Sequence, residues 1–568
     1  MTRAVRPSLR PEPSFSELFT PKLVTVLREG YGWASLRADV IAGITVAMVA
    51  LPLSMAIAKA SGTTPDRGLY TAIIGGFLIS ALGGSRFQIG GPAGAFIVLV
   101  ASVIERHGID GLLLATLMAG VFLLAIGFLR LGTYIKYIPH PVTVGFTSGI
   151  AVIIFASQIS DLLGLTLPGR EPAAFLPKLA AIREALPTVT PAAVAVALGS
   201  IALILVLRRL RSHWPGFLVA IVAAAAMSAV LSSMGLPVAT IGSKFGGIPS
   251  TLPAPALPPI SLARMADLLP DALAIALLGG IESLLSAVVA DGMSGRRHRS
   301  NCELVAQGFA NIGSAIFGGI CATGTIARTA TNVRAGGRSP IAGIVHSATL
   351  LVLMLVAAPV ASYIPLAALA AVLAIVSWNM AERVEFVAIL RRSRGDSAVL
   401  LVTFLLVVFR DLTEGIAVGV VMGSILFMHR MAQLVEVQTH VPIIQTDVAD
   451  AEGAARVPYE GPPGADEVTV YTLTGPFFFG AAAEVAAVLD RIGQTPRVFV
   501  LDMSGVPFVD STAAQSLAGF VRKANRNGTR IVLSGASEGV RRVLDQHEIR
   551  EPAVIFTTTV AAAMARAD

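Results

Sequence analysis

Residues 317–340, FGGICATGTIARTATNVRAGGRSP, combine glycines, closely spaced threonines and the guanidinium of Arg328, and they lie between long apolar segments. Inside a membrane the backbone can stay non-helical only where protein or a water-filled cavity surrounds it. A helix that starts near Thr323 would direct its free N–H groups and the positive end of its dipole at an anion. A membrane-buried arginine costs about 2.5–3.5 kcal/mol on insertion scales, so a compensating group is expected. Because broken helices near the membrane centre are typical of secondary transporters, this segment predicts an anion site.

The composition places most of the chain in lipid. Of its 568 residues, 54% are hydrophobic and only 14% are charged, whereas soluble domains carry about 25% charged residues. The net charge of +7 comes from basic residues scattered among short loops. The orientation of membrane helices explains this scatter better than binding to nucleic acid does.

Apolar runs long enough to span a membrane fill residues 38–433 and fall into two sets. The first set, repeat one (38–234), is expected at 38–58, 68–83, 89–104, 111–131, 141–163, 191–209 and 215–234. The second set, repeat two (267–433), is expected at 267–291, 303–320, 323–337, 340–361, 364–381, 397–411 and 413–432.

The third segment of each set is short and interrupted by glycine. These segments are 89–104 and 323–337, and the tripeptide Tyr-Ile-Pro follows in each half, at 137–139 and 363–365. Broken segments at matching positions predict the binding site of a transporter. An odd number of spans in each half requires the two halves to be inverted relative to each other.

Basic residues set the expected orientation. With a cytoplasmic N-terminus, Lys and Arg are more frequent in the inner loops, which include RRLR (208–211), GRRHRS (295–300) and LRRSR (390–394). This bias predicts that both termini lie in the cytoplasm, with the protein in the cell (inner) membrane. Residues 1–37 form an N-terminal arm, in which 15–29 have the apolar spacing of an interfacial helix.

The composition changes after residue 433. Residues 434–466 are polar and rich in Pro and Gly, as in a linker. Strand-like and helix-like runs then alternate through 467–568, which predicts a small α/β domain. Asp510 and Ser511 are candidate caps for the helix that follows them. This domain has no Walker loop, metal-ligand cluster or nucleophile elbow in its sequence, so catalysis is not expected.

Six stretches are specific enough for comparison with a known family. They are LPLSMAIAKASG (51–62), RGLYTAIIGGF (67–77), GGSRFQIGGPAGAF (83–96), the run from 279 to 319, TGTIARTATNVRAGGRSPIAG (323–343) and LDMSGVPFVDSTA (501–513). They resemble the SulP family of anion transporters, of the sulfate-permease and solute-carrier-26 type, and its STAS domain. The resemblance implies a multi-pass α-helical membrane protein with a seven-plus-seven inverted repeat, two broken half-helices and a cytoplasmic STAS domain. It also implies a homodimer, and a core domain that moves against a gate domain.

The resemblance places the anion site between the two broken helices and the first and eighth spans. The site carried over falls on the ranges 52–57, 91–95, 282–286 and 325–329. The individual substrate-binding residues are Ile57, Gly91, Pro92, Ala93, Gly94, Thr325, Ile326, Ala327, Arg328 and Thr329. Three of them depart from the family pattern: many members have Ser at Ala327, Thr at Ala93 and an aromatic residue at Ile57. Fewer hydroxyls leave the anion more dependent on backbone N–H groups and on Arg328.

Glu282 and Ser286, on the eighth span, are the expected coupling-ion residues. Glu282 could carry a proton or coordinate Na⁺ with Ser286, or it could form a structural salt bridge with Arg328. In the STAS domain, Thr512 resembles the position that is phosphorylated in stand-alone STAS proteins. It is a candidate regulatory residue together with Ser511, and a plain helix-start role is the alternative.

These inferences predict secondary active transport of an inorganic anion by alternating access, with sulfate as first choice and H⁺ or Na⁺ as the coupling ion. Transport of bicarbonate or a dicarboxylate, a channel-like conductor without coupling, and a membrane-anchored regulator remain as alternatives. The protein is expected not to be an enzyme and to need no cofactor. Expected partners are a small anion, the lipid bilayer, a second copy of the chain and a cytoplasmic protein that binds the STAS domain, but no nucleic acid.

Overall fold

The computed structural model describes residues 14–133, 138–169, 171–172, 174–210, 215–410, 412–433, 436–437, 441–442, 468–479 and 496–565. It divides into two compact units, Met1–Val420 and Val421–Asp568, and each is described by itself. Residues 1–13 of the expected arm, Tyr137 of the repeated tripeptide, residues 443–466 of the expected linker and the helix-like run at 481–492 lie outside the described residues.

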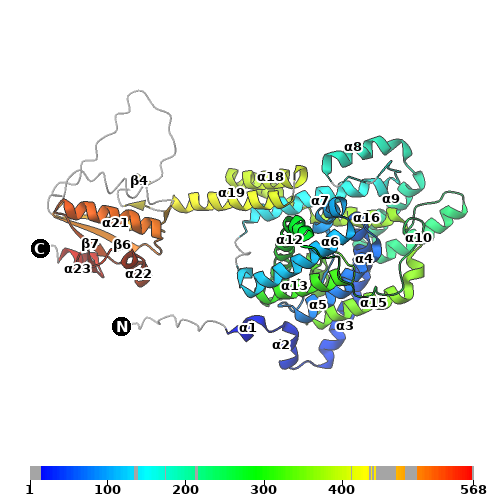
Figure 1. Cartoon of the computed structure of the whole chain (residues 1–568), viewed down its shortest axis with the longest axis horizontal. Helices are drawn as coiled ribbons and strands as arrows, with labels where there is room; N and C mark the ends of the chain where they lie inside the picture. The colour runs from blue at the N-terminus through cyan, green and yellow to red at the C-terminus, as the bar shows by residue number, and fades with distance from the viewer. Residues whose placement is uncertain are drawn as a thin grey trace. The chain divides into compact units, whose positions relative to one another are not determined.

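Most of the described residues are helical (Figure 1). Nine helices of the described chain are long and apolar enough to cross a membrane. They are α3 (Trp33–Ala60), α6 (Ile97–Phe128), α7 (His140–Leu162), α9 (Pro191–Leu210), α10 (Gly216–Ser233), α12 (Leu262–Ser294), α15 (Ile341–Ala361), α16 (Leu366–Met380), which α17 extends, and α19 (Leu412–Ala432). Shorter helices fill the other expected spans: α4 (Pro65–Tyr70), α5 (Gly76–Leu82), α13 (Ser300–Ile316), α14 (Ile326–Arg334) and α18 (Arg394–Phe409).

Several helix boundaries differ from the expected ones. The two segments expected at 89–104 and 111–131 are joined as α6, but Gly108 between them has a non-helical backbone, with φ 69° and ψ −174°, so two helices meet there. The helix expected over 15–29 is two helices, α1 (Phe15–Phe19) and α2 (Lys22–Arg28). Thr20 between them is extended, because the residue before a proline avoids helical backbone angles. The helices α8 (Phe175–Ala185), α11 (Ile241–Phe245) and α17 (Arg383–Arg392) were not expected from the apolar runs.

The membrane helices pack into two groups. Helices α3, α4, α5, α6, α12, α13, α14 and α15 pack on one another and form the core group. Helices α7, α9, α10, α16 and α18 pack on one another and form the gate group. Each half of the sequence contributes helices to both groups, as the inverted repeat requires. Figure 1 shows α6, α12 and α13 of the core group packed together, and one apolar cluster continues across both groups.

The second unit contains a sheet with strand order β4-β3-β5-β6-β7-β8. The strands are β3 (Glu436–Val437), β4 (Val441–Pro442), β5 (Val468–Thr474), β6 (Val498–Gly505), β7 (Arg530–Ser534) and β8 (Ile555–Thr557). Strands β5 to β8 are parallel, and β3 is antiparallel to both β4 and β5. The range 434–466, expected to be a linker, therefore contains two strands. They could not be predicted, because a strand of two residues has no detectable alternation of apolar and polar residues.

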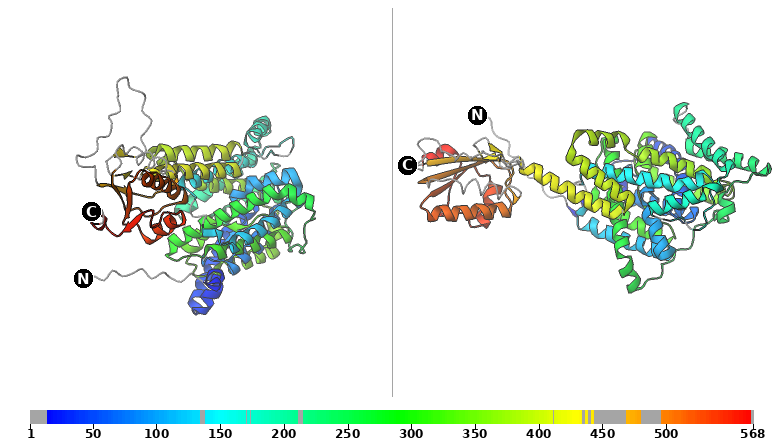
Figure 2. Two further views of the ribbon diagram at one scale, coloured as in Figure 1. Left: turned by 60° about the vertical axis from the view of Figure 1, so that its left-hand side comes forward. Right: turned by 90° about the horizontal axis from the view of Figure 1, so that it is seen from above.

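Helices cover both faces of this sheet (Figure 2). Alternate residues of a strand point to opposite faces. Phe499 and Leu501 accordingly pack in one cluster with α21 (Ser511–Arg526) and α22 (Glu538–Gln546), whereas Val498 and Val500 pack with Ala563 of α23 (Val560–Met564). The predicted α/β domain is confirmed. Asp510 caps α21, since its Oδ1 accepts a hydrogen bond from the Ala513 N–H at 2.8 Å, while Ser511 is the first helical residue.

Candidate functional site

Two short strands bring the broken segments together. Strand β1 (Gly90–Gly91) pairs antiparallel with β2 (Thr323–Gly324), and Gly91 lies opposite Thr323. Just beyond β1, the 3-10 turn Gly94–Phe96 leads into α6, and just beyond β2 the helix α14 begins. The prediction of two half-helices at matching positions is confirmed, and both begin at one buried ribbon.

Neither half-helix has a side-chain cap at its N-terminus. The Phe96 N–H donates to the Ala93 carbonyl at 3.1 Å, and the Thr329 N–H donates to the Thr325 carbonyl at 3.0 Å. The N–H groups of Gly94, Ala95 and residues 326–328 precede these bonds and have no acceptor within their own helix. Two sets of free donors, each at the positive end of a helix dipole, can therefore hydrogen-bond an oxyanion.

Polar side chains on neighbouring helices hold the loop that precedes α14. Asn311 bonds Ala322 in both directions, with its Nδ2 donating to the carbonyl at 2.8 Å and its Oδ1 accepting from the N–H at 2.9 Å. Thr71 Oγ1 accepts from the Ile320 N–H at 2.7 Å. These bonds satisfy non-helical backbone within the membrane, which lipid could not do. Sequence reasoning missed both residues, although a polar side chain within an apolar span is a signal that could have found them.

Thr329 and Ser286, two expected site residues, join both broken segments to α12. The Ile89 N–H donates to Thr329 Oγ1 at 3.1 Å, and the Ser286 hydroxyl donates to the same oxygen at 3.1 Å. The Thr325 N–H donates to the Ile89 carbonyl at 3.1 Å. Thr329 and Ser286 are fully buried. The network fixes the two helix N-termini relative to each other.

Arg328 is only 1% exposed, and its guanidinium is directed at the first broken segment. Its Nη1 donates to the Gly90 carbonyl at 3.2 Å, and its Nη2 donates to the Pro92 carbonyl at 3.2 Å and to Ser54 Oγ at 3.0 Å. The arginine thus connects α14 to the first half-helix and to α3. The positive charge of Arg328 lies beside the free N–H groups of the half-helices, while most of the guanidinium N–H donors are already bonded within the protein. Ser54 lies within the range 52–57 that the resemblance assigned to the site, but its bond to Arg328 was not expected.

Glu282 lies on α12, one turn before Ser286. Among the described residues no ion pair joins it to Arg328, so the structural salt bridge that we considered is not formed. Its Oε2 is buried and accepts no hydrogen bond from the described part of the chain. A carboxyl group in this setting must either be protonated or have a cation bound to it.

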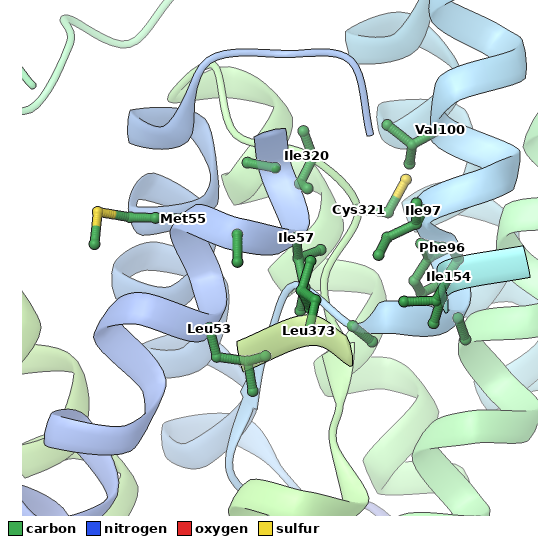
Figure 3. Packing of buried hydrophobic residues seen from close by; sticks show 14 of the residues in the cluster. Leu53, Met55, Ile57, Phe96, Ile97, Val100, Ile154, Ile320, Cys321 and Leu373 are labelled. Carbon is green, nitrogen blue, oxygen red and sulfur yellow. The ribbon is translucent and has the colours of Figure 1, made fainter. Parts of the chain in front are cut away.

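Apolar side chains cover the N-terminus of the first half-helix (Figure 3). Ile57 of α3, Phe96 and, from the gate group, Ile154 of α7 and Leu373 of α16 are each at most 2% exposed. A Cβ placed on Gly94 would lie 3.1 Å from Ile154 Cδ1. The gate group therefore packs directly against the start of this half-helix. At the start of α14, by contrast, Ala327 is exposed.

Models of known families match the chain in two regions. The sulfate permease family matches residues 36–403, and the STAS domain matches residues 461–562. The chain belongs to the sulfate permease family. This membership, with the half-helices already described, confirms the family that the sequence motifs indicated.

Members of the sulfate permease family align along nearly the whole chain. The putative sulfate transporter YvdB of Bacillus subtilis is 40% identical over 91% of this chain and 94% of its own length. The bicarbonate transporter BicA of Picosynechococcus sp. is 31% identical over 90% of this chain and 91% of its own length. The sodium-independent sulfate anion transporter of Bos taurus is 30% identical over 90% of this chain and 86% of its own length.

Solved structures of the family agree with the fold. The overall structure of SLC26A9 has a TM-score of 0.82 at 19% identity, covering 96% of this chain and 93% of that one. The transmembrane domain of a cyanobacterial bicarbonate transporter BicA has a TM-score of 0.61 at 30% identity, covering 69% of this chain and 98% of that one. The predicted multi-pass helical fold with a C-terminal STAS domain is therefore confirmed.

The candidate regulatory residues belong to the second unit. Ser511 and Thr512 are exposed in the first turn of α21, immediately after the cap Asp510. Their positions are compatible with modification and with a plain helix start alike.

Gly91 provides a test of the ribbon between the half-helices. Its φ is +152°, and a Cβ there would overlap Arg328 Nη1. Gly91→Ala should therefore lower anion uptake by about tenfold or more, because both the backbone and the guanidinium must shift. The measurement is the initial uptake rate into proteoliposomes. Gly292→Ala is the matched control, since Gly292 on α12 has no atom within 4 Å of a new Cβ; equal rates for the two variants would contradict a close-packed ribbon.

Proposed function

We propose that this chain is a secondary transporter that carries a small inorganic anion, with sulfate as first choice, across the cell (inner) membrane. The observation that carries the proposal is the pair of half-helices whose free N–H groups start from one buried ribbon. The family and the printed names of its members support transport rather than catalysis. The basic residues of the loops support a cytoplasmic position for both termini.

Sulfate presents four oxygens and two charges. The free N–H groups of two helix N-termini can bind several of these oxygens, and the nearby Arg328 charge offsets part of the negative charge. A relative that is 40% identical is named a putative sulfate transporter, which supports this choice. We expect Gly91 to Gly94, Thr325 to Thr329 and Ile57 to surround the anion.

Glu282 opposes a divalent anion unless a cation neutralises it. Because its Oε2 is buried without a hydrogen-bond donor in the described structure, we propose that H⁺ or Na⁺ binds there, with Ser286 beside it. The cation and the anion would then cross together as the core group moves against the gate group, which is alternating access. No resident metal or cofactor is needed for this cycle.

Bicarbonate is the second candidate. Three of the five Arg328 N–H donors already serve Gly90, Pro92 and Ser54, and Ala93 and Ala327 offer no hydroxyl. A site with fewer available donors suits a monovalent anion, and a relative that is 31% identical is named a bicarbonate transporter. A dicarboxylate carrier or an uncoupled conductor would use the same half-helices.

Flux through purified protein in liposomes tests these proposals. Radiolabelled sulfate should accumulate only when a pH or Na⁺ gradient is imposed, and selenate should compete with it. If bicarbonate is carried while excess sulfate neither competes nor moves, bicarbonate replaces sulfate as the substrate. Flux that is insensitive to either gradient would indicate a conductor or an exchanger.

The STAS domain should act in assembly or regulation, through a homodimer or a cytoplasmic partner protein. Since β3 and β4 belong to its sheet, a clean truncation removes residues 434–568 rather than ending near residue 440. We expect the truncated protein to keep the order of anion preference, even if its abundance or rate falls. Competition by a panel of anions measures this order, and a changed order would mean that the domain helps to shape the site.

A further inference from the structure

Lys59 and Asp161 form a buried ion pair between the two helix groups. Lys59 is the penultimate residue of α3 in the core group, and Asp161 is the penultimate residue of α7 in the gate group. The Lys59 Nζ contacts Asp161 Oδ2, and the two side chains are only 12% and 8% exposed. Lys59 lies in the stretch 51–62 that the sequence comparison singled out, and the proposed anion site does not use it.

Each charge of this pair depends on the other, because both are largely removed from water. A carboxylate near the C-terminal end of a helix faces the negative end of the dipole, so Asp161 depends on a cation. Removing one partner of a buried ion pair leaves an uncompensated charge. Lys178, Lys244 and Glu171 also lie within electrostatic range of Lys59, but Lys178 already pairs with Glu171 at 3.2 Å.

The pair lies at the outer end of the proposed pathway. Helices α3 and α7 run in the same direction, because three expected crossings separate them along the chain. With a cytoplasmic N-terminus, both of their C-terminal ends face outward. Lys59 is two residues beyond Ile57, or about 3 Å further along the helix axis. The pair is thus on the outer side of Ile57, between the core and gate groups.

We propose that Lys59 and Asp161 are the outer gate of the transport cycle. Their ion pair closes the outer end between the core and gate groups in this structure, and it must separate before an anion enters from outside. This inference rests on the proposed transport function. It assigns a role to two residues that are not among the expected anion-site residues.

Cysteine labelling tests the gate without measuring transport. Ile57→Cys serves as the reporter and is labelled with a membrane-impermeant maleimide added from outside to full-length protein in oriented vesicles. The native Cys302 and Cys321 are 2% and 0% exposed, so the parent chain is the blank. In the reporter background, Lys59→Met and Asp161→Asn should each label about tenfold faster, because the closed state loses its ion pair.

Two further variants make the test specific. The double variant with Lys59→Asp and Asp161→Lys swaps the two charges and should label at the reporter's own rate. If the slow labelling returns, misfolding is excluded as the cause of fast labelling in the single variants. Arg106→Met is the matched control, because its ion pair with Asp271 joins α6 to α12 within the core group, and it should leave labelling unchanged. Unchanged labelling in both single variants, or an exchange variant that labels as fast as they do, would overturn the proposal.

Labelling with reagent on the inner side, together with a transport assay, separates failure of the gate from failure of the proposed transport function. If the single variants label faster only with reagent on the inner side, the pair is not an outer gate. If labelling follows the expected pattern but no tested anion crosses the membrane in the parent protein, the gate stands and the proposed substrate fails.

Discussion

Replacing Arg328 with alanine should abolish sulfate uptake while the protein still purifies as its native oligomer. The substitution removes the positive charge beside the free N–H groups and the donors that serve the Gly90 and Pro92 carbonyls and Ser54. Each buried carbonyl left unpaired costs about 1–3 kcal/mol, so the first half-helix should lose its position as well. The measurement is the initial rate of radiolabelled sulfate uptake into proteoliposomes.

Two variants separate charge from geometry in this experiment. Arg328→Lys keeps the charge but replaces a planar fork with a single ammonium, so its uptake should fall between that of the wild type and that of Arg328→Ala. Arg334→Ala is the matched control, because Arg334 is the exposed arginine at the end of the same helix. Near-normal sulfate uptake by Arg328→Ala would show that the site lies elsewhere.

Replacing Glu282 with glutamine should uncouple the transporter. The side chain keeps its size, but it no longer needs a proton or Na⁺ in its buried position. We expect uptake to lose its response to an imposed pH or Na⁺ gradient, while exchange of internal for external anion continues. Comparing gradient-driven uptake with exchange in the same liposomes measures the difference.

Asp110→Asn provides the control for Glu282, since it removes a carboxylate from an exposed position on α6. That variant should remain as gradient-dependent as the wild type. If gradient-driven uptake persists unchanged in Glu282→Gln, the carboxylate is structural and coupling occurs at another group.

The spans and the broken helices could be predicted from the sequence because their signals are local. Length and apolarity mark a membrane helix, and glycines around Pro92 and Thr325 mark the two interruptions. The helices α8, α11 and α17 escaped prediction because they are too short to cross a membrane. Strands β3 and β4 escaped because each has only two residues, and because β3 joins the sheet by pairing with β5, which is distant in the sequence.

The sequence predicted which segments form the site, but not the contacts that their side chains make. That the two broken segments lie together followed from their matching positions, but the strand pairing of Gly91 with Thr323 did not. The direction of the Arg328 side chain did not either, because Ser54 and the Pro92 carbonyl reach it only through the packing of α3 and α14. The ion pair between Lys59 and Asp161 likewise depends on contact between two helix groups, which no local pattern reports.

The central claim is that the anion binds between the N-termini of the two half-helices, and selenate tests it most directly. Selenate has the shape and charge of sulfate, and its selenium can be located by anomalous scattering in crystals of the full-length protein. We predict one selenium peak within hydrogen-bonding reach of the backbone N–H groups of Ala95 and Ala327, absent in crystals of Arg328→Ala. A selenium peak elsewhere in the membrane unit, or none between these N-termini in a protein that transports sulfate, would contradict the account.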